Sequence, residues 1–335
     1  MVATGLPVFF RYGRLSEASD YFPVKAQNNK SNVSEKRPYL RNCFFIVGPT
    51  ATGKSELAAE VAQQLGAEIV SADAFQIYRG LDVLTAKPNR AILAKAPHHL
   101  IGTVPLSEEM NAEKYRALAE EIIARSKPVI VVGGSGLYVK GLTHGLASLP
   151  GANSKLREKL ERATSEELLR SLRGLDPETA EKIDQQNRRR LIRAVEVCLL
   201  TGKPFSAQRT EWSGTLPANG VFVYRERAEL YARIDRRVEE MFEAGVVEEV
   251  RAQDYLGPTA EKTLGLREIR GLLAGEISRA ECIAKIQQAT RRYAKRQLTW
   301  FQRQTNFAPL NLSAHRPAEA IELISQSASR VFARG

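Results

Sequence analysis

The chain has 335 residues, of which 43% are hydrophobic and 26% are charged, as in an ordinary globular enzyme with one large or two medium-sized domains. No apolar stretch is long enough to span a membrane, and the three cysteines are far apart with no His or Cys at metal-ligand spacing, so the sequence argues against an integral membrane protein and a zinc site. The net charge of +11 predicts either a polyanionic partner such as nucleic acid or a merely solubilising surface.

Residues 1 to about 42 are rich in Asn, Ser and Tyr and show no sustained periodicity, which predicts a flexible N-terminal extension. Glu17, Asp20 and Glu35 weaken the interpretation as a transit peptide, and the segment lacks the apolar region of a secretion signal. A transit segment and a mis-assigned start codon therefore both stay open. The three cysteines are expected to be buried free thiols in a reducing compartment, which favours the cytoplasm.

A complete phosphate-binding loop follows this extension. Residues 48–55 match the pattern G-x-x-x-x-G-K-[ST], which arises by chance in roughly one chain in a hundred of this length. An apolar run at 43–47 predicts a buried strand before the loop, and 54–65 has the pattern of a helix after it. Backbone N–H groups, the helix N-terminus and the Lys54 ammonium group would together bind a diphosphate or triphosphate.

Strand and helix patterns alternate from 43 to about 145. Further strands are predicted at 67–71 and 128–133, and a second helix at 111–126. Apolar β-branched runs separated by helices indicate a P-loop-type α/β fold, with a parallel sheet covered by helices on both faces. Ligands of such sheets bind at the carboxyl ends of the strands, where the unusual loops 48–55, 72–79 and 133–138 lie.

Asp73 is the carboxylate that could act beside the phosphate loop. Many NTPases place an acid at the end of an apolar strand, but the strand at 129–132 ends in Gly133-Gly134-Ser135-Gly136. Asp73 instead follows the strand at 67–71, where it could ligate magnesium or accept a proton. A turn aspartate is the alternative. Gln76 is suited to hydrogen bonding with a base edge.

The second half of the chain is mainly helical. Residues 146–204 are predicted to form an inserted helical subdomain, while 43–145 and 205–312 form the core and 313–335 a C-terminal tail. The core would gain a strand at 221–224 and helices at 228–244, 260–273 and 278–303. Two basic clusters, Arg188–Arg193 and Lys285–Arg303, favour contact with phosphate over a purely solvated surface; the second has six basic residues and no acidic one.

Seven motifs in chain order resemble those of the tRNA dimethylallyltransferases, the tRNA isopentenyltransferase family, in its bacterial type. They extend from about residue 43 to 310 and comprise Gly48–Ser55, Asp73–Arg79 with Thr85–Pro88, Pro97–Leu100, Val132–Tyr138, Arg190–Val197, Thr201–Pro204 and Arg291–Phe301. The resemblance implies transfer of a dimethylallyl group from dimethylallyl diphosphate to N6 of adenosine 37, beside the anticodon of tRNAs that read codons beginning with U. The products would be N6-dimethylallyladenosine and diphosphate.

The resemblance also implies roles for individual residues. Asp73 would be the base, the Thr50 hydroxyl would steady the bridging region of the diphosphate, and Arg233 and Arg237 would complete the site, with Arg227 and Arg236 as alternatives. Ser55 would ligate Mg²⁺. The diphosphate-binding residues would be Gly48, Pro49, Thr50, Ala51, Thr52, Gly53, Lys54 and Ser55. The tRNA anticodon stem-loop would contact Asp73, Ala74, Phe75, Gln76, Ser135, Arg189, Arg190, Leu191, Ile192 and Arg193.

The sequence departs from the family pattern at a few positions. Ala74 and Phe75 replace the usual Ser and Met, Leu84 replaces a glycine, and Ser135 stands where threonine is usual. These differences affect details of tRNA recognition and leave the base and the phosphate loop unchanged. Two other functions stay open: a small-molecule or nucleotide kinase with Asp73 as base, and a non-catalytic RNA-binding protein with a vestigial loop. We expect a monomer.

Overall fold

The computed structural model describes residues 38–126, 128–147, 149–208 and 219–334. Contacts divide them into a helical unit, from 146 to 208, and an α/β unit formed by 38–145 and 219–334. Most of the predicted N-terminal extension lies outside the described residues, apart from a short 3-10 helix, η3 (Pro38–Asn42). No described helix has both the length and the apolar character needed to cross a membrane.

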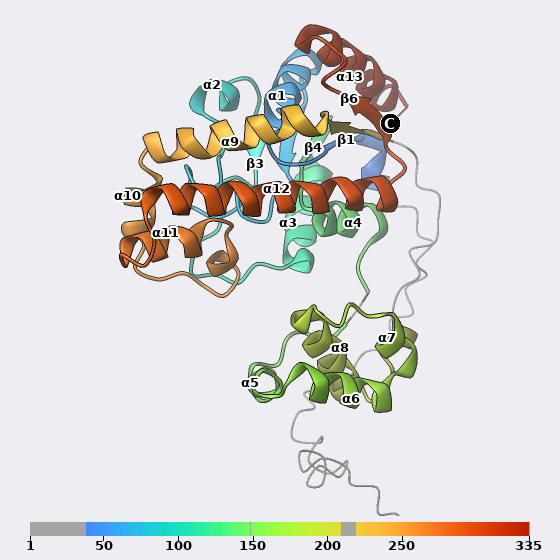
Figure 1. The fold of residues 1–335 in the computed structure, drawn as a ribbon. Coiled ribbons are helices and arrows are strands. Elements are labelled where there is room, and N and C mark those ends of the chain that lie inside the picture. Colours follow the sequence, from blue (N-terminus) through green and yellow to red (C-terminus); the bar gives the residue numbers. More distant parts are fainter. Residues whose placement is uncertain (1–37, 127, 148, 209–218, 335) are drawn as a thin grey trace, which may run out of the picture. The chain divides into compact units, whose positions relative to one another are not determined.

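The α/β unit is built on a six-stranded sheet in the order β3-β2-β4-β1-β5-β6, and every pair of neighbours is parallel (Figure 1). This confirms the predicted fold class. β1 lies between β4 and β5 and is buried along its whole length, as its continuous apolar sequence requires. The strands are β1 (Cys43–Val47), β2 (Glu68–Ser71), β3 (His98–His99), β4 (Val129–Gly133), β5 (Gly220–Tyr224) and β6 (Ala308–Asn311).

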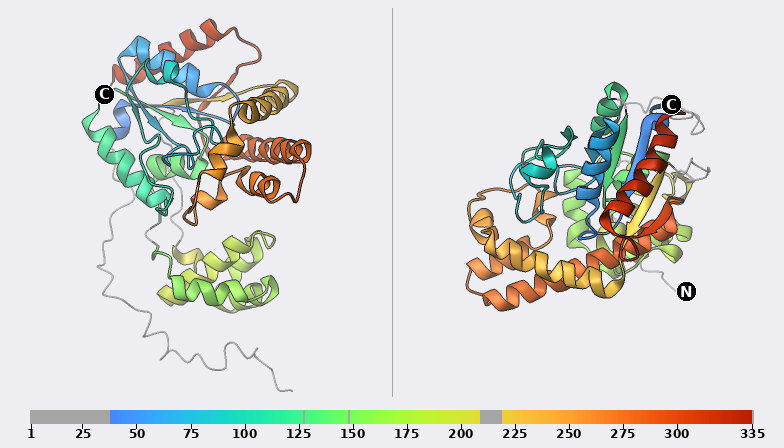
Figure 2. Two further views of the ribbon diagram at one scale, coloured as in Figure 1. Left: turned by 90° about the vertical axis from the view of Figure 1, so that its left-hand side faces the viewer. Right: turned by 90° about the horizontal axis from the view of Figure 1, so that it is seen from above.

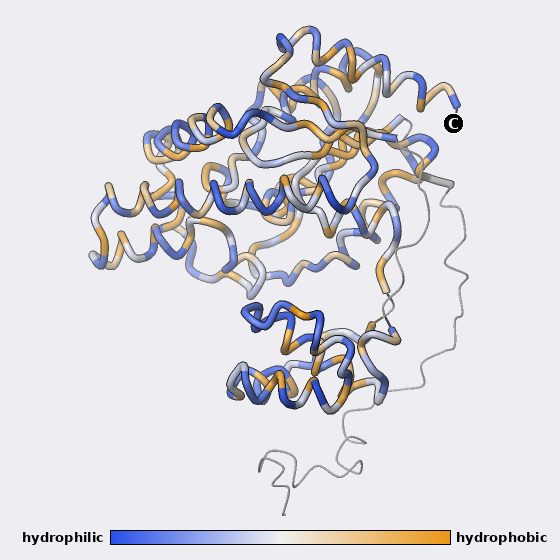
Figure 3. The backbone as a smooth tube through the Cα atoms, turned by 45° about the vertical axis from the view of Figure 1, so that its right-hand side comes forward, coloured by the Kyte–Doolittle hydropathy of each residue, from blue (hydrophilic) through white to orange (hydrophobic). Residues whose placement is uncertain are grey.

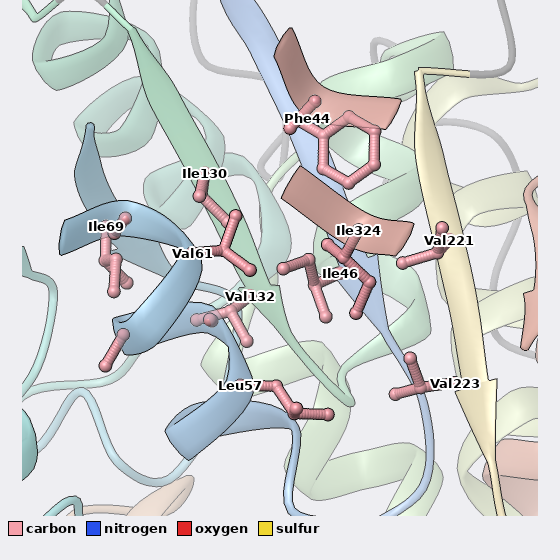
Figure 4. Packing of buried hydrophobic residues seen from close by; sticks show 14 of the residues in the cluster. Phe44, Ile46, Leu57, Val61, Ile69, Ile130, Val132, Val221, Val223 and Ile324 are labelled. Atoms are coloured by element: carbon pink, nitrogen blue, oxygen red, sulfur yellow. The ribbon is translucent and has the colours of Figure 1, made fainter. Parts of the chain in front are cut away.

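One face of the sheet is covered by α1 (Lys54–Leu65) and α13 (Pro317–Phe332), which pack against each other. Their apolar side chains meet those of the central strands in one buried cluster (Figure 4). Leu57 and Val61 of α1 point toward Ile46 and Val132, and Ile324 of α13 lies beside Ile46. Burial of this cluster fixes α1, and hence the loop before it, against the sheet.

The opposite face carries α3 (Ala112–Arg125) and α4 (Gly136–His144), whose Tyr115 and Tyr138 rings stack with centroids 4.0 Å apart. The long helix α12 (Arg279–Gln304) contacts both α4 and α9 (Figure 2). The other helices of this unit are α2 (Arg90–Leu93), α9 (Arg227–Glu243), α10 (Val246–Arg251), η5 (Ala260–Lys262) and α11 (Leu266–Leu273).

The helical unit has its own core, in which Leu168, Leu172, Leu191 and Val195 are buried. Hydrophobic and hydrophilic residues alternate along its helices, as amphipathic packing requires (Figure 3). The elements are α5 (Ser154–Arg162), α6 (Ser165–Leu175), α7 (Pro177–Lys182), α8 (Arg188–Thr201) and η4 (Ser206–Gln208).

Several elements differ from the sequence prediction. The segment 313–335, expected as a tail, contains α13, which completes the core over α1. β3 and β6 are edge strands of two and four residues, too short to show periodicity. The predicted helix at 260–273 is divided into η5 and α11 because Gly265, at φ 92°, takes the left-handed conformation that interrupts a helix.

Candidate active site at the carboxyl edge of the sheet

The phosphate loop follows β1 and leads into α1, as predicted. Gly53 has φ 93° and Ala51 has φ 63°, so two residues of the loop lie in the left-handed region. For alanine this conformation is strained, and it persists because the surroundings hold it. The fully buried Thr52 contributes by donating its hydroxyl to the carbonyl oxygen of Pro49 over 2.9 Å.

Three arginines hold successive residues of this loop from outside. Their contacts are Arg237 Nη1 to Thr50 Oγ1 (3.1 Å), Arg233 Nε to the Ala51 carbonyl oxygen (2.8 Å) and Arg225 Nε to the Thr52 carbonyl oxygen (2.9 Å). Burial lowers the pKa of both Arg233 and Arg237 below that of an exposed arginine. Guanidinium groups that lie close together and are partly desolvated repel one another, so binding of an anion between them is strongly favourable.

Lys54 lies half-buried at the start of α1. Its Nζ donates to the carbonyl oxygen of Pro49 over 3.2 Å. Burial lowers the Lys54 pKa to about 8, with repulsion from Arg237 acting in the same direction and attraction to Asp73 opposing it. A bound diphosphate would raise the Lys54 pKa again, because its negative charge stabilises the ammonium form.

Asp73 lies two residues beyond β2 and makes a turn. Its Oδ1 accepts hydrogen bonds from the backbone N–H groups of Phe75 (2.9 Å) and Gln76 (3.2 Å). Asp73 nevertheless lines two cavities, one shared with Thr50 and Arg237 and the other with Lys54 and Ser55. Asp73 therefore stabilises the turn through Oδ1 and also presents its carboxylate to both cavities, so the two interpretations of this residue are compatible.

The first cavity is lined by both polar and apolar side chains. Its polar lining includes Thr50, Asp73, Arg237 and Tyr293. The apolar lining comes from Phe75, Leu84, Ile234, Val238, Met241, Leu264 and Ile286. Such a cavity suits a short hydrocarbon chain attached to a diphosphate, because each half of the molecule meets groups of its own polarity.

The second cavity is lined mostly by polar groups, including Lys54, Ser55, Ser71, Asp73 and His98. The described residues contain no cluster of three His, Cys, Asp or Glu side chains that would enclose a metal ion. The Ser55 hydroxyl and a nearby carboxylate do fit the sparse protein ligation of Mg²⁺, which takes its other ligands from water and phosphate oxygens. The residues present are therefore compatible with the predicted metal.

The predicted RNA-binding loop residues are close to one another. The backbone N–H of Ala74 donates to Ser135 Oγ over 2.9 Å, which joins the loops after β2 and β4. The Gln76 amide Nε2 donates to the carbonyl oxygens of Thr85 (3.2 Å) and Ala86 (3.0 Å). The Gln76 amide nitrogen is thus engaged within the protein, which leaves its amide oxygen as the group for a base.

The remaining predicted RNA-binding residues belong to the helical unit. Arg189 and Arg190 are exposed at the start of α8, whereas the Leu191 and Ile192 side chains are buried in the unit's core. Arg193 donates to Glu196 (2.7 Å) and to the Pro150 carbonyl oxygen (2.7 Å). Of these five residues, Arg189 and Arg190 have side chains available to a phosphate.

Sequence reasoning missed Arg225 and Gln297. Arg225 follows the last residue of β5, so its position at the carboxyl end of a core strand was a usable signal. Gln297 lies inside the motif Arg291–Phe301. The basic and aromatic residues of this motif predict RNA contact, and nothing in the local sequence indicates a contact with the phosphate loop. Of the alternative arginines, Arg227 lies over the Tyr231 ring and Arg236 is exposed.

The family model described as IPP transferase matches residues 76–304 of the chain. The chain belongs to this family. Among the relatives of this chain, "tRNA dimethylallyltransferase 1" of Citrifermentans bemidjiense is 45% identical over 269 residues, covering 77% of this chain and 88% of the relative. The "tRNA dimethylallyltransferase" of Akkermansia muciniphila is 44% identical over 265 residues, or 78% and 90% of the two chains.

Solved structures of the family have the same fold. The full-length tRNA isopentenylpyrophosphate transferase of Bacillus halodurans has a TM-score of 0.63 at 31% identity, covering 87% of this chain and 96% of that one. A eukaryotic dimethylallyltransferase solved "acting on tRNA" has a TM-score of 0.67 at 26% identity, over 80% and 73% of the chains. The chain is thus an enzyme, a prenyltransferase, and membership of this family argues against the kinase and the vestigial-loop interpretations.

Proposed function

We propose that the enzyme transfers the dimethylallyl group of dimethylallyl diphosphate to N6 of the adenosine next to the anticodon, in tRNAs that read codons beginning with U. The observation that carries this proposal is the first cavity, which Thr50 and Arg237 line together with a set of apolar side chains. Asp73 lines the same cavity, where a proton would be released. Family membership supplies the class of reaction.

The reaction follows from the charges around the loop. The adenine N6 attacks C1 of the allyl group, the C1–O bond breaks, and the bonding electron pair leaves with diphosphate. Arg233, Arg237, Lys54 and the loop N–H groups stabilise the negative charge that develops on the leaving oxygen. Asp73 accepts the proton that N6 loses. The apolar lining keeps water away from the allylic carbon while the bond breaks.

A divalent metal is part of the proposal. Ser55 would hold Mg²⁺ in the second cavity, with water and diphosphate oxygens as its other ligands. When bound, the ion would neutralise part of the diphosphate charge and so make diphosphate a better leaving group.

RNA would be bound through phosphate contacts from exposed basic residues. α12 carries six of them, and the first turn of α8 contains Arg189 and Arg190. The six on α12 are Arg279, Lys285, Arg292, Lys295, Arg296 and Arg303. Such contacts supply affinity and register on the anticodon stem without reading sequence. We further propose that the enzyme acts as a monomer in the cytoplasm, where tRNA is modified.

The deciding experiment is incubation with unmodified tRNA, dimethylallyl diphosphate and Mg²⁺, followed by mass spectrometry of the nucleosides. Prenylated adenosine is expected only in tRNAs that read codons beginning with U. Its absence from all of them would refute the proposal. A parallel reaction with ATP in place of the prenyl diphosphate tests for kinase activity, and no phosphorylated product is expected.

A further inference from the structure

Gln297 makes two hydrogen bonds that join separate loops of the active site. The side chain comes from α12 and is 6% exposed. Its Oε1 accepts from the backbone N–H of Thr50 over 2.9 Å, and its Nε2 donates to the Gly134 carbonyl oxygen over 2.9 Å. One N–H and one C=O as partners fix which way the amide is turned. One side chain thus connects the phosphate loop to the loop after β4.

The space around this amide is closed. A Cβ atom added to Gly134 would lie 2.3 Å from Gln297 Nε2, so a residue larger than glycine at that position would displace the amide. Tyr293 precedes Gln297 by four residues on the same face of α12 and lines the first cavity with Thr50 and Asp73. Burial raises the pKa of Tyr293, and the polar side chains of Ser135 and Gln297 oppose that rise. The loops after β1, β2 and β4 therefore all meet this face of α12.

We propose that Gln297 is a positioning residue for prenyl transfer, acting through Thr50. Gln297 holds the Thr50 backbone, while Arg237 holds the Thr50 hydroxyl, so the two contacts together set where that hydroxyl faces the diphosphate. Displacing a positioned group by about 1 Å can lower a rate by about a hundredfold. The inference rests on the proposed function and adds to it a residue that lines neither of the two cavities.

The first test is the Gln297→Met enzyme, which keeps the side-chain length and loses both hydrogen bonds. We expect kcat to fall by about tenfold to a hundredfold, with KM for tRNA within about twofold of wild type because the exposed basic side chains of α12 are unchanged. The matched control is Gln287→Met. Gln287 lies on the same helix, and its Nε2 donates to the Asp235 carbonyl oxygen over 3.2 Å, on α9. Gln287→Met should keep wild-type kcat.

The second test is the Gln297→Glu enzyme, whose activity should depend on pH. The ionised carboxylate accepts from the Thr50 N–H but has no proton for the Gly134 carbonyl oxygen, whereas the protonated acid can make both bonds. Burial beside a carbonyl oxygen raises the pKa of the introduced carboxyl group, so the protonated form is regained as the pH falls. Its kcat relative to wild type should therefore rise from about pH 8.5 to about pH 6. A purely structural role would leave this ratio flat.

The outcomes separate this inference from the proposed function. If wild type forms no prenylated adenosine, the proposed function fails. If wild type is active and Gln297→Met retains its kcat, only the positioning role is refuted. The positioning role is also refuted if the kcat of Gln297→Glu relative to wild type does not change with pH. If Gln297→Met does not fold, this second measurement is the deciding one.

Discussion

Arg237 on α9 donates through Nη1 to the hydroxyl oxygen of Thr50 over 3.1 Å, joining residues 187 positions apart in the chain. Burial lowers the pKa of Arg237, and Asp73 is the main charge that opposes this effect. The charged form of the Arg237 guanidinium group is therefore stabilised by a few partners within the site. Thr50 is the partner that belongs to the phosphate loop.

Removal of that hydroxyl should weaken catalysis at the diphosphate. Thr50→Val keeps the shape of the side chain and leaves the Arg237 Nη1 donor without its acceptor, a loss of about 1.5–3 kcal/mol for a bond to a charged group. We expect kcat/KM for dimethylallyl diphosphate to fall by about tenfold to a hundredfold. Thr50→Ser keeps the hydroxyl and should stay within a fewfold of wild type. Similar losses in both enzymes would contradict this role of the hydroxyl.

Asp73→Asn separates the base from the turn. The amide oxygen can still accept from the N–H groups of Phe75 and Gln76, so the loop conformation is kept while the proton acceptor is lost. Single-turnover rates should fall by about a hundredfold to ten-thousandfold. The dissociation constant for dimethylallyl diphosphate, measured by calorimetry, should change little. An equal loss in both quantities would exclude Asp73 as the base.

Diphosphate binding should weaken above pH 8. The Lys54 pKa is lowered to about 8 in the free enzyme, so Lys54 is charged below that pH and loses its proton above it. Lys54→Arg remains charged throughout and responds equally to the ionisation of diphosphate itself. The ratio of the wild-type dissociation constant to that of Lys54→Arg should therefore rise between about pH 8 and pH 9.5. A constant ratio would show that Lys54 keeps its proton.

Glu196 should be a major source of stability in the helical unit. Its fully buried carboxylate accepts from Arg157 (3.0 Å), Arg193 (2.7 Å) and the Asn153 N–H (2.9 Å). Glu196→Ala leaves two arginines without their partner, and we expect a loss of about 3 kcal/mol, since both arginines retain some contact with water. This loss of stability can be measured by hydrogen exchange of the α8 backbone amides. Glu158→Ala, which breaks the exposed pair with Arg162, should have little effect.

Arg292 should contribute to RNA affinity through charge alone. It is exposed on α12, and Arg292→Gln should reduce the slope of log K against log salt by about one for tRNA binding. Arg330→Gln removes the same charge from α13, which packs with α1 on the sheet face opposite α3 and α4, and should leave the slope unchanged. Equal changes in the two enzymes would mean that only net charge matters.

The parts of the site that could be predicted are those encoded by contiguous residues. The phosphate loop, the strands beside it and Asp73 each have a local pattern, and α1 begins and ends as expected, at Lys54 and Leu65. The partners of the loop could not be predicted in the same way. Arg225 and Gln297 reach it from 173 and 247 residues away, so only the folded sheet reveals these contacts. Likewise, the burial of Leu191 and Ile192 depends on packing within the helical unit.

The position of α13 has a consequence for how the protein is made. The phosphate loop emerges from the ribosome before two of its partners in the fold, because β1 pairs with β5, and α1 is covered by α13, and both partners come much later in the chain. Until then the apolar face formed by Leu57 and Val61 has no cover from α13. The helical unit, built from contiguous residues, can fold first. During translation the nascent α/β unit should therefore be the part that needs chaperones.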